Sequence, residues 1–223
     1  MKEEIAPGRG MAAASVAGEA LLLHPFKAIF WPAGQSLFIA DLHLGKAGHF
    51  RRNGLPVPAA VNSGNQERLL SLLFDFQPRQ VYFLGDLFHS AYNPAWEEFG
   101  DLLAGYPGIG FHLVLGNHDI LPERAYQEAG LALQRQPLPL GPFLLSHHPL
   151  ETVPAGQYNL AGHLHPGVFL RGTGRQRLRL PCFYFGPQQG ILPAFGAFTG
   201  MAAVAPKAGE QVFVIADEAV VAV

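Results

Sequence analysis

Cysteine, charge and long apolar runs are all scarce in this sequence. Its single cysteine, Cys182, excludes an internal disulfide. Charged residues make up only 14% of the chain, and 15 Lys and Arg against 17 Asp and Glu give a net charge of −2. This charge provides no general attraction to nucleic acid or to an anionic membrane, so any polyanion must be bound locally. No apolar stretch reaches the roughly 18 residues of a membrane helix, and we expect no membrane association.

The beginning of the chain also lacks the pattern of a targeting signal. Glu3 and Glu4 interrupt it, and the apolar run at residues 21–23 is too short for the core of a signal peptide. We therefore expect a cytoplasmic protein. Residues 1–17 are rich in Ala and Gly without periodicity, which predicts a flexible tail. Residues 18–223 are expected to form a single domain with a large core, because 49% of the chain is hydrophobic.

Short apolar runs alternate with longer amphipathic segments over the first 165 residues. The apolar runs predict buried strands at residues 37–40, 81–84, 111–115, 143–145 and 158–161. Helices are predicted at residues 66–76, from Pro94 to residue 103, and from Pro122 to the residue before Gly130. Further β-like segments are found at residues 19–30, 168–170, 178–185, 191–198 and 211–223. This order indicates an α/β fold with a second, more antiparallel sheet.

Polar side chains follow each of the five strands predicted between residues 37 and 161. These strand ends carry Asp41-Leu42-His43, Gly85-Asp86, Gly116-Asn117-His118-Asp119, His147-His148 and Gly162-His163-Leu164-His165. The carboxyl ends of strands in an α/β sheet meet at one edge, so we expect these side chains to converge. A donor set of Asp, Asn and His without cysteine suits Mn, Fe, Zn or Ni, and it is large enough for two ions.

Two local features support a crowded site. A glycine precedes Asp86, Asn117 and His163, where it would permit a positive φ and a close approach of the backbone to the ions. The Asp-x-His and His-x-His spacings place both side chains of each pair on the same side of an extended segment.

Each motif alone has a simpler explanation. A lone histidine at a strand end is usually hydrogen-bonded or solvated, and Asp41 or Asp86 alone would serve as a helix N-cap or a turn former. Gly116-Asn117 alone is a common turn dipeptide. Recurrence at five successive strand ends favours a metal site over these explanations. His24 and His112 lie outside the motifs and are interpreted as structural.

Residues 37–166 contain, in order, the motifs DLHLG, GDLFHS, GNHD, SHHP and GHLHP. This series resembles the calcineurin-like metallophosphoesterase superfamily. A narrower resemblance, to the ligase-associated DNA damage response endonucleases of the PdeM type, rests on DLHLGKAGHFRRNGLPVP, LPCFYFGP and LPAFGAFTG. The superfamily resemblance implies a four-layer αββα sandwich in which two mixed sheets are flanked by helices.

The resemblance also implies roles for individual residues. One ion would be held by Asp41, His43 and His165, the other by Asn117, His147 and His163, with Asp86 bridging the two. His147 is preferred to His148 as the ligand because it stands two residues before the proline, which leaves His148 on the substrate side. His118 would donate a proton to the leaving oxygen, and Asp119 could orient it. General-acid help of this kind is worth about 10²- to 10⁴-fold in rate.

Substrate contacts are expected from basic residues near the motifs. Arg51 and Arg52 lie in a Gly- and Pro-containing segment and could bind phosphate, although two solvated surface arginines explain them equally well. His89 could line the pocket or cap the following helix. Arg171, Arg175, Arg177 and Arg179 form a basic stripe that could track a nucleic-acid backbone. A solvated face that protects a sheet edge explains this stripe more readily.

Together these features predict a phosphodiesterase that uses two divalent ions, manganese first among them, and a hydroxide that bridges the ions. The family resemblance makes it a nuclease acting on DNA in repair, with a DNA ligase, a helicase or an exonuclease as possible partners. Two alternatives stay open. One is a phosphatase or pyrophosphatase acting on a small nucleotide or a lipid-linked diphosphate, and the other is a binding scaffold that has lost catalysis. The apolar C-terminal segment would either cover the core or form a homodimer contact.

Overall fold

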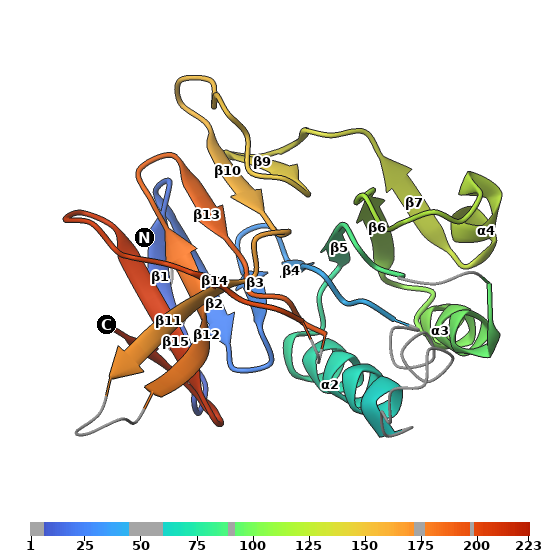
Figure 1. Cartoon of the computed structure of the whole chain (residues 1–223). Coiled ribbons are helices and arrows are strands. Elements are labelled where there is room, and N and C mark those ends of the chain that lie inside the picture. The colour runs from blue at the N-terminus through green and yellow to red at the C-terminus, as the bar shows by residue number, and fades with distance from the viewer. Residues whose placement is uncertain (1–6, 45–59, 89–91, 172–176, 197–198) are drawn as a thin grey trace.

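The structure is a computed structural model that describes residues 7–44, 60–88, 92–171, 177–196 and 199–223 (Figure 1). The strands among these residues form two β-sheets that face each other. The first sheet is formed, in spatial order, by β1 (Ala12–Val16), β2 (Glu19–His24), β3 (Ala28–Trp31), β4 (Ser36–Ile39), β5 (Gln80–Leu84), β6 (Gly110–Val114) and β7 (Leu131–Gln134). Strands β1 to β4 pair antiparallel, and β4 to β7 pair parallel.

Parallel pairing requires a crossover between successive strands, and helices provide it here. Helix α2 (Ala60–Phe76) connects β4 to β5, α3 (Pro94–Ala104) connects β5 to β6, and α4 (Glu123–Glu128) connects β6 to β7. Helix α3 begins where predicted, because Oδ1 of Asn93 accepts the N–H of Ala95 at 3.0 Å and Pro94 needs no donor in the first turn.

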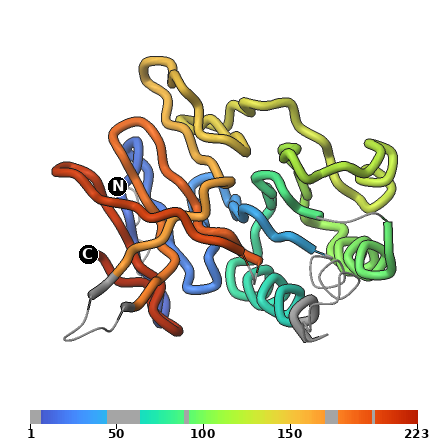
Figure 2. The backbone as a smooth tube through the Cα atoms, viewed as in Figure 1, coloured from blue at the N-terminus to red at the C-terminus, as the bar shows by residue number. Residues whose placement is uncertain are grey.

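The second sheet is also mixed. It consists of β8 (Leu138–Leu140), β9 (Phe143–Ser146), β10 (Tyr158–Ala161), β11 (Pro166–Arg171), β12 (Arg177–Phe185), β13 (Gln189–Ile191), β14 (Ala202–Ala203), β15 (Gln211–Ala216) and β16 (Ala219–Ala222). Its order is β14-β11-β12-β13-β10-β9-β8, with β15 on β12 and β16 on β15. The C-terminal strand β16 lies beside β1, where the N–H of Val220 donates to Gly10 O at 2.8 Å (Figure 2).

Side-chain alternation along β5 explains how the layers are joined. Tyr82 and Leu84 pack into the core between the two sheets, whereas Val81 and Phe83 pack against the helices. The core between the sheets is closed from the opposite side by residues such as Phe143, whose ring centroid lies 6.3 Å from that of Phe38. The two-sheet sandwich expected from the sequence is confirmed, and the helices among the described residues cover the first sheet.

Two expectations about the chain are wrong. Residues 12–16 were expected within a flexible tail, but they form β1, in which Ala14 and Val16 are buried in the core while Ala13 and Ser15 face outward. Residues 192–196 were expected to continue a strand, but β13 ends at Ile191. Beyond it, the N–H groups of Phe195 and Gly196 donate to the carbonyls of Ala40 and Asp41 at 2.9 and 3.0 Å, which ties this segment to the end of β4.

Other expectations are neither confirmed nor contradicted. The single domain over residues 18–223 and the homodimer stay predictions. Among the described residues no helix is long and apolar enough to cross a membrane.

Cys182 is buried in β12, and burial raises the pKa of its thiol to about 12. This thiol is therefore neutral at physiological pH.

His24 at the end of β2 is buried, as expected of a structural histidine. Its Nδ1 accepts the N–H of Phe26 at 3.0 Å, and its ring lies against those of Phe26 and Phe76. Burial lowers the pKa of His24 to about 4, although the nearby carboxylate of Asp75 acts in the opposite direction. Between pH 6.5 and 4 the unfolded chain therefore binds a proton at this position that the folded chain does not bind.

We expect this difference to make the folded state less stable as pH falls through that window. One proton accounts for at most about 1.4 kcal/mol of unfolding free energy per pH unit. His24→Asn retains an acceptor for Phe26 but cannot titrate, so it should be less stable than the wild type at pH 7 and should lose less stability between pH 6.5 and 4. Urea unfolding of both proteins at several pH values measures this. Parallel losses in the two proteins would contradict the assignment.

Candidate metal centre

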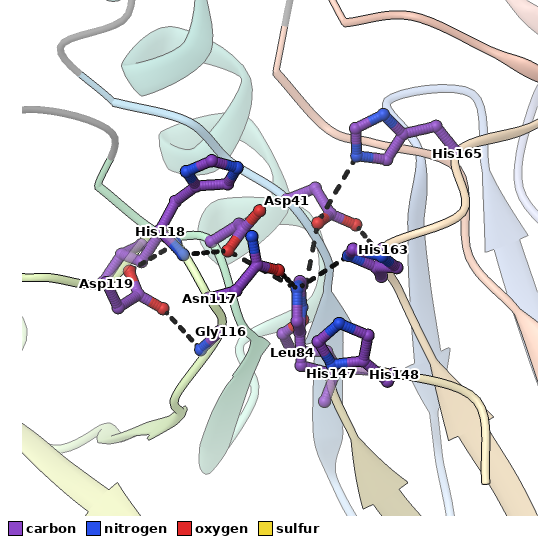
Figure 3. A network of polar contacts seen from close by, with 12 residues as sticks. Asp41, Leu84, Gly116, Asn117, His118, Asp119, His147, His148, His163 and His165 are labelled. Atoms are coloured by element: carbon purple, nitrogen blue, oxygen red, sulfur yellow. Dashed lines mark hydrogen bonds and ion pairs between the residues drawn. The ribbon is translucent and has the colours of Figure 1, made fainter.

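The polar side chains that follow five strands meet at one edge of the sandwich (Figure 3). Strands β4, β5 and β6 of the first sheet run parallel to one another, as do β9 and β10 of the second, so the carboxyl ends within each set lie together. The side chains are Asp41 and His43 after β4, Asp86 after β5, Asn117 after β6, His147 after β9, and His163 and His165 after β10. The structure thus brings together all seven residues that the sequence suggested as metal ligands.

The backbone at this edge is in a disfavoured conformation. Positive φ values occur at Asp41 (53°), His43 (49°), Asp86 (49°), His163 (65°) and His165 (48°). The left-handed region costs a residue with a side chain about 1–2 kcal/mol, and such residues concentrate at functional sites. The two residues of each pair therefore converge through tight turns, and the extended segment expected from their spacing is wrong.

Glycine is required next to these turns for two different reasons. Gly85 has a φ of 78°, and a Cβ at this position would collide with the ring of His147. At Gly162 the requirement is space, because a Cβ would lie 2.5 Å from Oδ2 of Asp41 and 2.8 Å from the Cβ of Ala40. The positive φ expected at each glycine before a ligand is found at Gly85, but not at Gly116 or Gly162.

The first group of donors consists of Asp41, His43 and His165, whose ligand atoms lie within 4.8 Å of one another. Oδ2 of the fully buried Asp41 accepts the N–H of His163 at 2.8 Å. Its Oδ1 faces Nε2 of His165 at 3.4 Å, and neither buried atom has a hydrogen-bond partner among the described residues. Nδ1 of His165 donates to Gly200 O at 3.1 Å, so in the neutral ring Nε2 carries a lone pair. A lone pair facing a buried carboxylate oxygen is stabilised by a cation between them.

The second group is centred on the buried ring of His147. Its Nδ1 donates to Leu84 O at 3.0 Å, which leaves a lone pair on Nε2 in the neutral ring. This Nε2 lies 2.9 Å from Oδ1 of Asn117, 3.4 Å from Oδ1 of Asp86 and 3.2 Å from Nδ1 of His163. So many lone-pair atoms repel one another unless a cation lies among them. This group also fits a divalent metal ion.

Asp41, Asp86 and His147 form a third set of ligand atoms within 4.8 Å, and it connects the two groups. His148 is exposed, its ring centroid lies 4.0 Å from that of His163, and it offers a ligand atom within 4.8 Å of those of His147 and His163. Burial lowers the pKa of His163 first, and the neighbouring His148 and His147 lower it further. Burial and His147 lower the pKa of His148 in the same way. Lower pKa values favour neutral imidazole, which is the form that binds a metal.

His118 and Asp119 lie beside these groups. The His118 side chain is exposed, and its backbone N–H donates to Oδ1 of Asp86 at 2.9 Å. The carboxylate of Asp119 accepts the N–H groups of Leu87, Phe88 and Gly116 at 2.9, 3.1 and 2.8 Å. Burial raises the pKa of Asp119 to about 6, although these donors act against the increase. Asp119 thus joins the loops after β5 and β6.

Several expected substrate residues cannot be compared with the structure. Arg51, Arg52 and His89 lie outside the described residues, as does Arg175 of the arginine stripe. Arg179 is the member of the stripe whose side chain is described. Its guanidinium donates to Met201 O and lies 4.3 Å from the ring centroid of Phe169.

The sequence did not reveal some groups that support the site. The carbonyls of Leu84 and Gly200 orient the rings of His147 and His165, and any residue type supplies a carbonyl, so no sequence signal exists for them. Gln136 accepts the backbone N–H of His147 at 2.9 Å and donates to Leu115 O at 3.2 Å. Gln136 stands before β8 and outside the motifs, so no sequence signal marks it either.

Comparison with known proteins agrees with this chemistry. Residues 35–175, more than half of the chain, match the family model of the calcineurin-like phosphoesterases. The crystal structure of the nuclease MPE from Pseudomonas putida is similar over 96% of this chain and 100% of that chain, with 31% sequence identity and a TM-score of 0.82.

A more distant likeness is to Yfce, a phosphoesterase from E. coli, with 15% identity and a TM-score of 0.42 over 83% of this chain and 95% of that chain. Comparison with curated proteins gives no significant match. The family model and the similarity to MPE confirm the resemblance found in the sequence. The chain therefore belongs to the calcineurin-like phosphoesterase family and is a metal-dependent phosphoesterase.

Proposed function

We propose that this protein is a nuclease that hydrolyses phosphodiester bonds of DNA with two divalent metal ions, manganese first among them, in cytoplasmic DNA repair. The observation that carries the proposal is the pair of donor groups at the sandwich edge, connected through Asp41, Asp86 and His147. Similarity to a nuclease along the whole chain supports a nucleic-acid substrate.

In this proposal Asp41, His43 and His165 would hold one ion, Asn117, His147 and His163 would hold the other, and Asp86 would be shared between the two groups. When bound, two such ions activate water for attack on phosphorus and stabilise the charge that develops on the phosphate oxygens. The residues match this task because they combine carboxylate, amide and imidazole donors without a thiolate. The carbonyls of Leu84 and Gly200 fix the histidine tautomers that present lone pairs to the ions.

His118, Asp119 and His148 have roles other than metal binding in this proposal. His118 is exposed beside the buried ligands, where its ring can donate a proton to the leaving oxygen. Its backbone N–H is held by Asp86 at 2.9 Å, so the position of the ring is coupled to a ligand. Asp119 acts as a positioning residue, because its carboxylate accepts backbone N–H groups of the two ligand loops. His148, exposed beside His163, would contact the substrate.

The first experiment is cleavage of single-stranded and plasmid DNA by manganese-loaded protein. We expect both DNA cleavage and hydrolysis of bis(p-nitrophenyl) phosphate, a chromogenic diester that shows the centre to be competent. Hydrolysis of the diester without DNA cleavage would overturn the nuclease assignment and favour a small nucleotide or diphosphate as substrate. A protein that binds manganese but hydrolyses neither compound would favour the binding scaffold.

Replacement of the shared carboxylate should remove metal and activity together. For Asp86→Ala we expect the manganese content to fall from two ions per chain to at most one, and the rate of diester hydrolysis to fall by more than about 100-fold, since even outer residues of metal sites contribute 10- to 100-fold. Asp101→Ala, at an exposed position in α3, is the matched control. Elemental analysis and diester kinetics measure both quantities. Two ions retained by Asp86→Ala would contradict the bridging role.

The proton-donor role of His118 predicts a dependence on the leaving group. His118→Ala should slow DNA cleavage by about 10²- to 10⁴-fold, because a deoxyribose alkoxide needs a proton to leave. The p-nitrophenyl ester of thymidine 5′-monophosphate releases a stable phenolate and should be affected far less. Ile120→Ala, exposed in the same loop, controls for disturbance of the loop. Equal rate losses on both substrates, with metal retained, would exclude His118 as the proton donor.

A further inference from the structure

A cavity of about 200 Å³ opens next to the first donor group. Its lining includes His165, Lys27 from the turn between β2 and β3, and Gly196, Thr199 and Met201. This volume holds several groups of the size of water, which occupies about 30 Å³ in the liquid. The cavity therefore has room for a phosphate group.

The wall of this cavity is fixed to the metal centre. The N–H of Gly196 donates to Asp41 O at 3.0 Å, and Gly200 O accepts from Nδ1 of His165. Arg179 holds the same segment from the second sheet by donating to Met201 O. A ligand in the cavity thus contacts the outer side of a residue of the first donor group, His165, and has a defined position relative to the ions.

Lys27 brings an unusual cation to this cavity. It has a left-handed backbone conformation with a φ of 64°, which asparagine or glycine adopts more easily than lysine. Its N–H donates to His24 O at 2.9 Å and closes the turn. In the part of the chain that the structure describes, no ion pair connects the Lys27 ammonium to a carboxylate.

A second cation lies close to Lys27. Arg68 of α2 is exposed, and its guanidinium carbon lies 5.8 Å from the ring centroid of Phe26, the residue that precedes Lys27. Burial, and secondarily the charge of Arg68, lowers the pKa of Lys27 to about 8. Two neighbouring cations destabilise each other, and a phosphate bound beside Lys27 in the cavity would stabilise both.

We propose that Lys27, assisted by Arg68, binds the phosphate adjacent to the scissile one in a nucleic-acid strand whose scissile phosphate lies at the metal centre. This inference rests on the proposed nuclease function and adds a binding site for a second phosphate to it. A chain with a net charge of −2 needs such local cations, because its overall field does not attract a polyanion. A substrate with a single phosphate, such as the chromogenic diester, leaves this site empty.

The test uses competitors of manganese-catalysed bis(p-nitrophenyl) phosphate hydrolysis. Three thymidine trinucleotides are compared: the ordinary TpTpT, and two versions in which one or the other phosphate is a neutral methylphosphonate. These compounds have the same nucleosides and differ in one charge. We expect the wild type to bind TpTpT about tenfold more tightly than at least one methylphosphonate trimer, as expected for one charge-assisted hydrogen bond. Titration calorimetry of the same trimers provides a second readout, independent of turnover.

Lys27→Met should abolish this tenfold preference, whereas its rate on the diester and its manganese content should stay within about twofold of the wild type. Lys27→Arg keeps the cation and should retain most of the preference. Lys207→Met is the matched control, because it removes the same charge at an exposed position between β14 and β15. Thermal unfolding of each variant confirms that it is folded.

Three results would overturn the proposal: no preference in the wild type, a preference that persists in Lys27→Met, or an equal loss of diester hydrolysis in that variant. The last would place Lys27 in the metal centre itself. Failure of the nuclease function is distinguishable, because it appears as intact DNA with an active diesterase. A charge preference that depends on Lys27 would then still support the second phosphate site.

Discussion

The fully buried carboxylate of Asp41 is the group on which this edge of the structure depends. One of its oxygens is held by the N–H of His163, 122 residues later in the chain, and this bond joins the end of β4 in the first sheet to the end of β10 in the second. The other oxygen has a lone-pair nitrogen, Nε2 of His165, as its neighbour. A buried carboxylate without compensation costs several kcal/mol, so the site is complete only with a cation. Metal binding and the alignment of the two sheets are therefore coupled.

This coupling explains why the ligand loops have a disfavoured backbone conformation. Left-handed backbone at Asp41, Asp86 and His163 is disfavoured by about 1–2 kcal/mol per residue, and the hydrophobic core between the sheets has to compensate for it. Asp119 stabilises these loops, since its carboxylate accepts three backbone N–H groups of two ligand loops. The histidine rings are then oriented by carbonyls at fixed positions. The ligands are consequently preorganised in the folded chain, which reduces the entropy lost when ions bind.

The parts of this arrangement that the sequence predicted are those with a local signal. Buried strands such as β5 and β9 are short apolar runs, and the ligands follow them directly, so the site could be located from strand ends alone. Strand β1 was missed because its inward residues, Ala14 and Val16, stand among small residues that give little contrast in hydrophobicity. The turns at Asp41 and His163 were missed because φ depends on tertiary contacts. Lys27 carries no motif, and only the fold places it beside a residue 138 positions later, His165.

The fold gives the cations Arg179 and Lys27 different roles. The arginine stripe suggested a track for a nucleic-acid backbone, but the guanidinium of Arg179 donates to Met201 O and stacks on Phe169, and so stabilises the cavity wall. Among the described residues Lys27 has no ion pair with a carboxylate, and it lines the cavity together with His165. In single strands each neutralised phosphate changes the logarithm of affinity by about −0.7 per unit of log salt. A site with one or two phosphate contacts therefore selects its substrate through position at the metal centre, and long-range attraction contributes little.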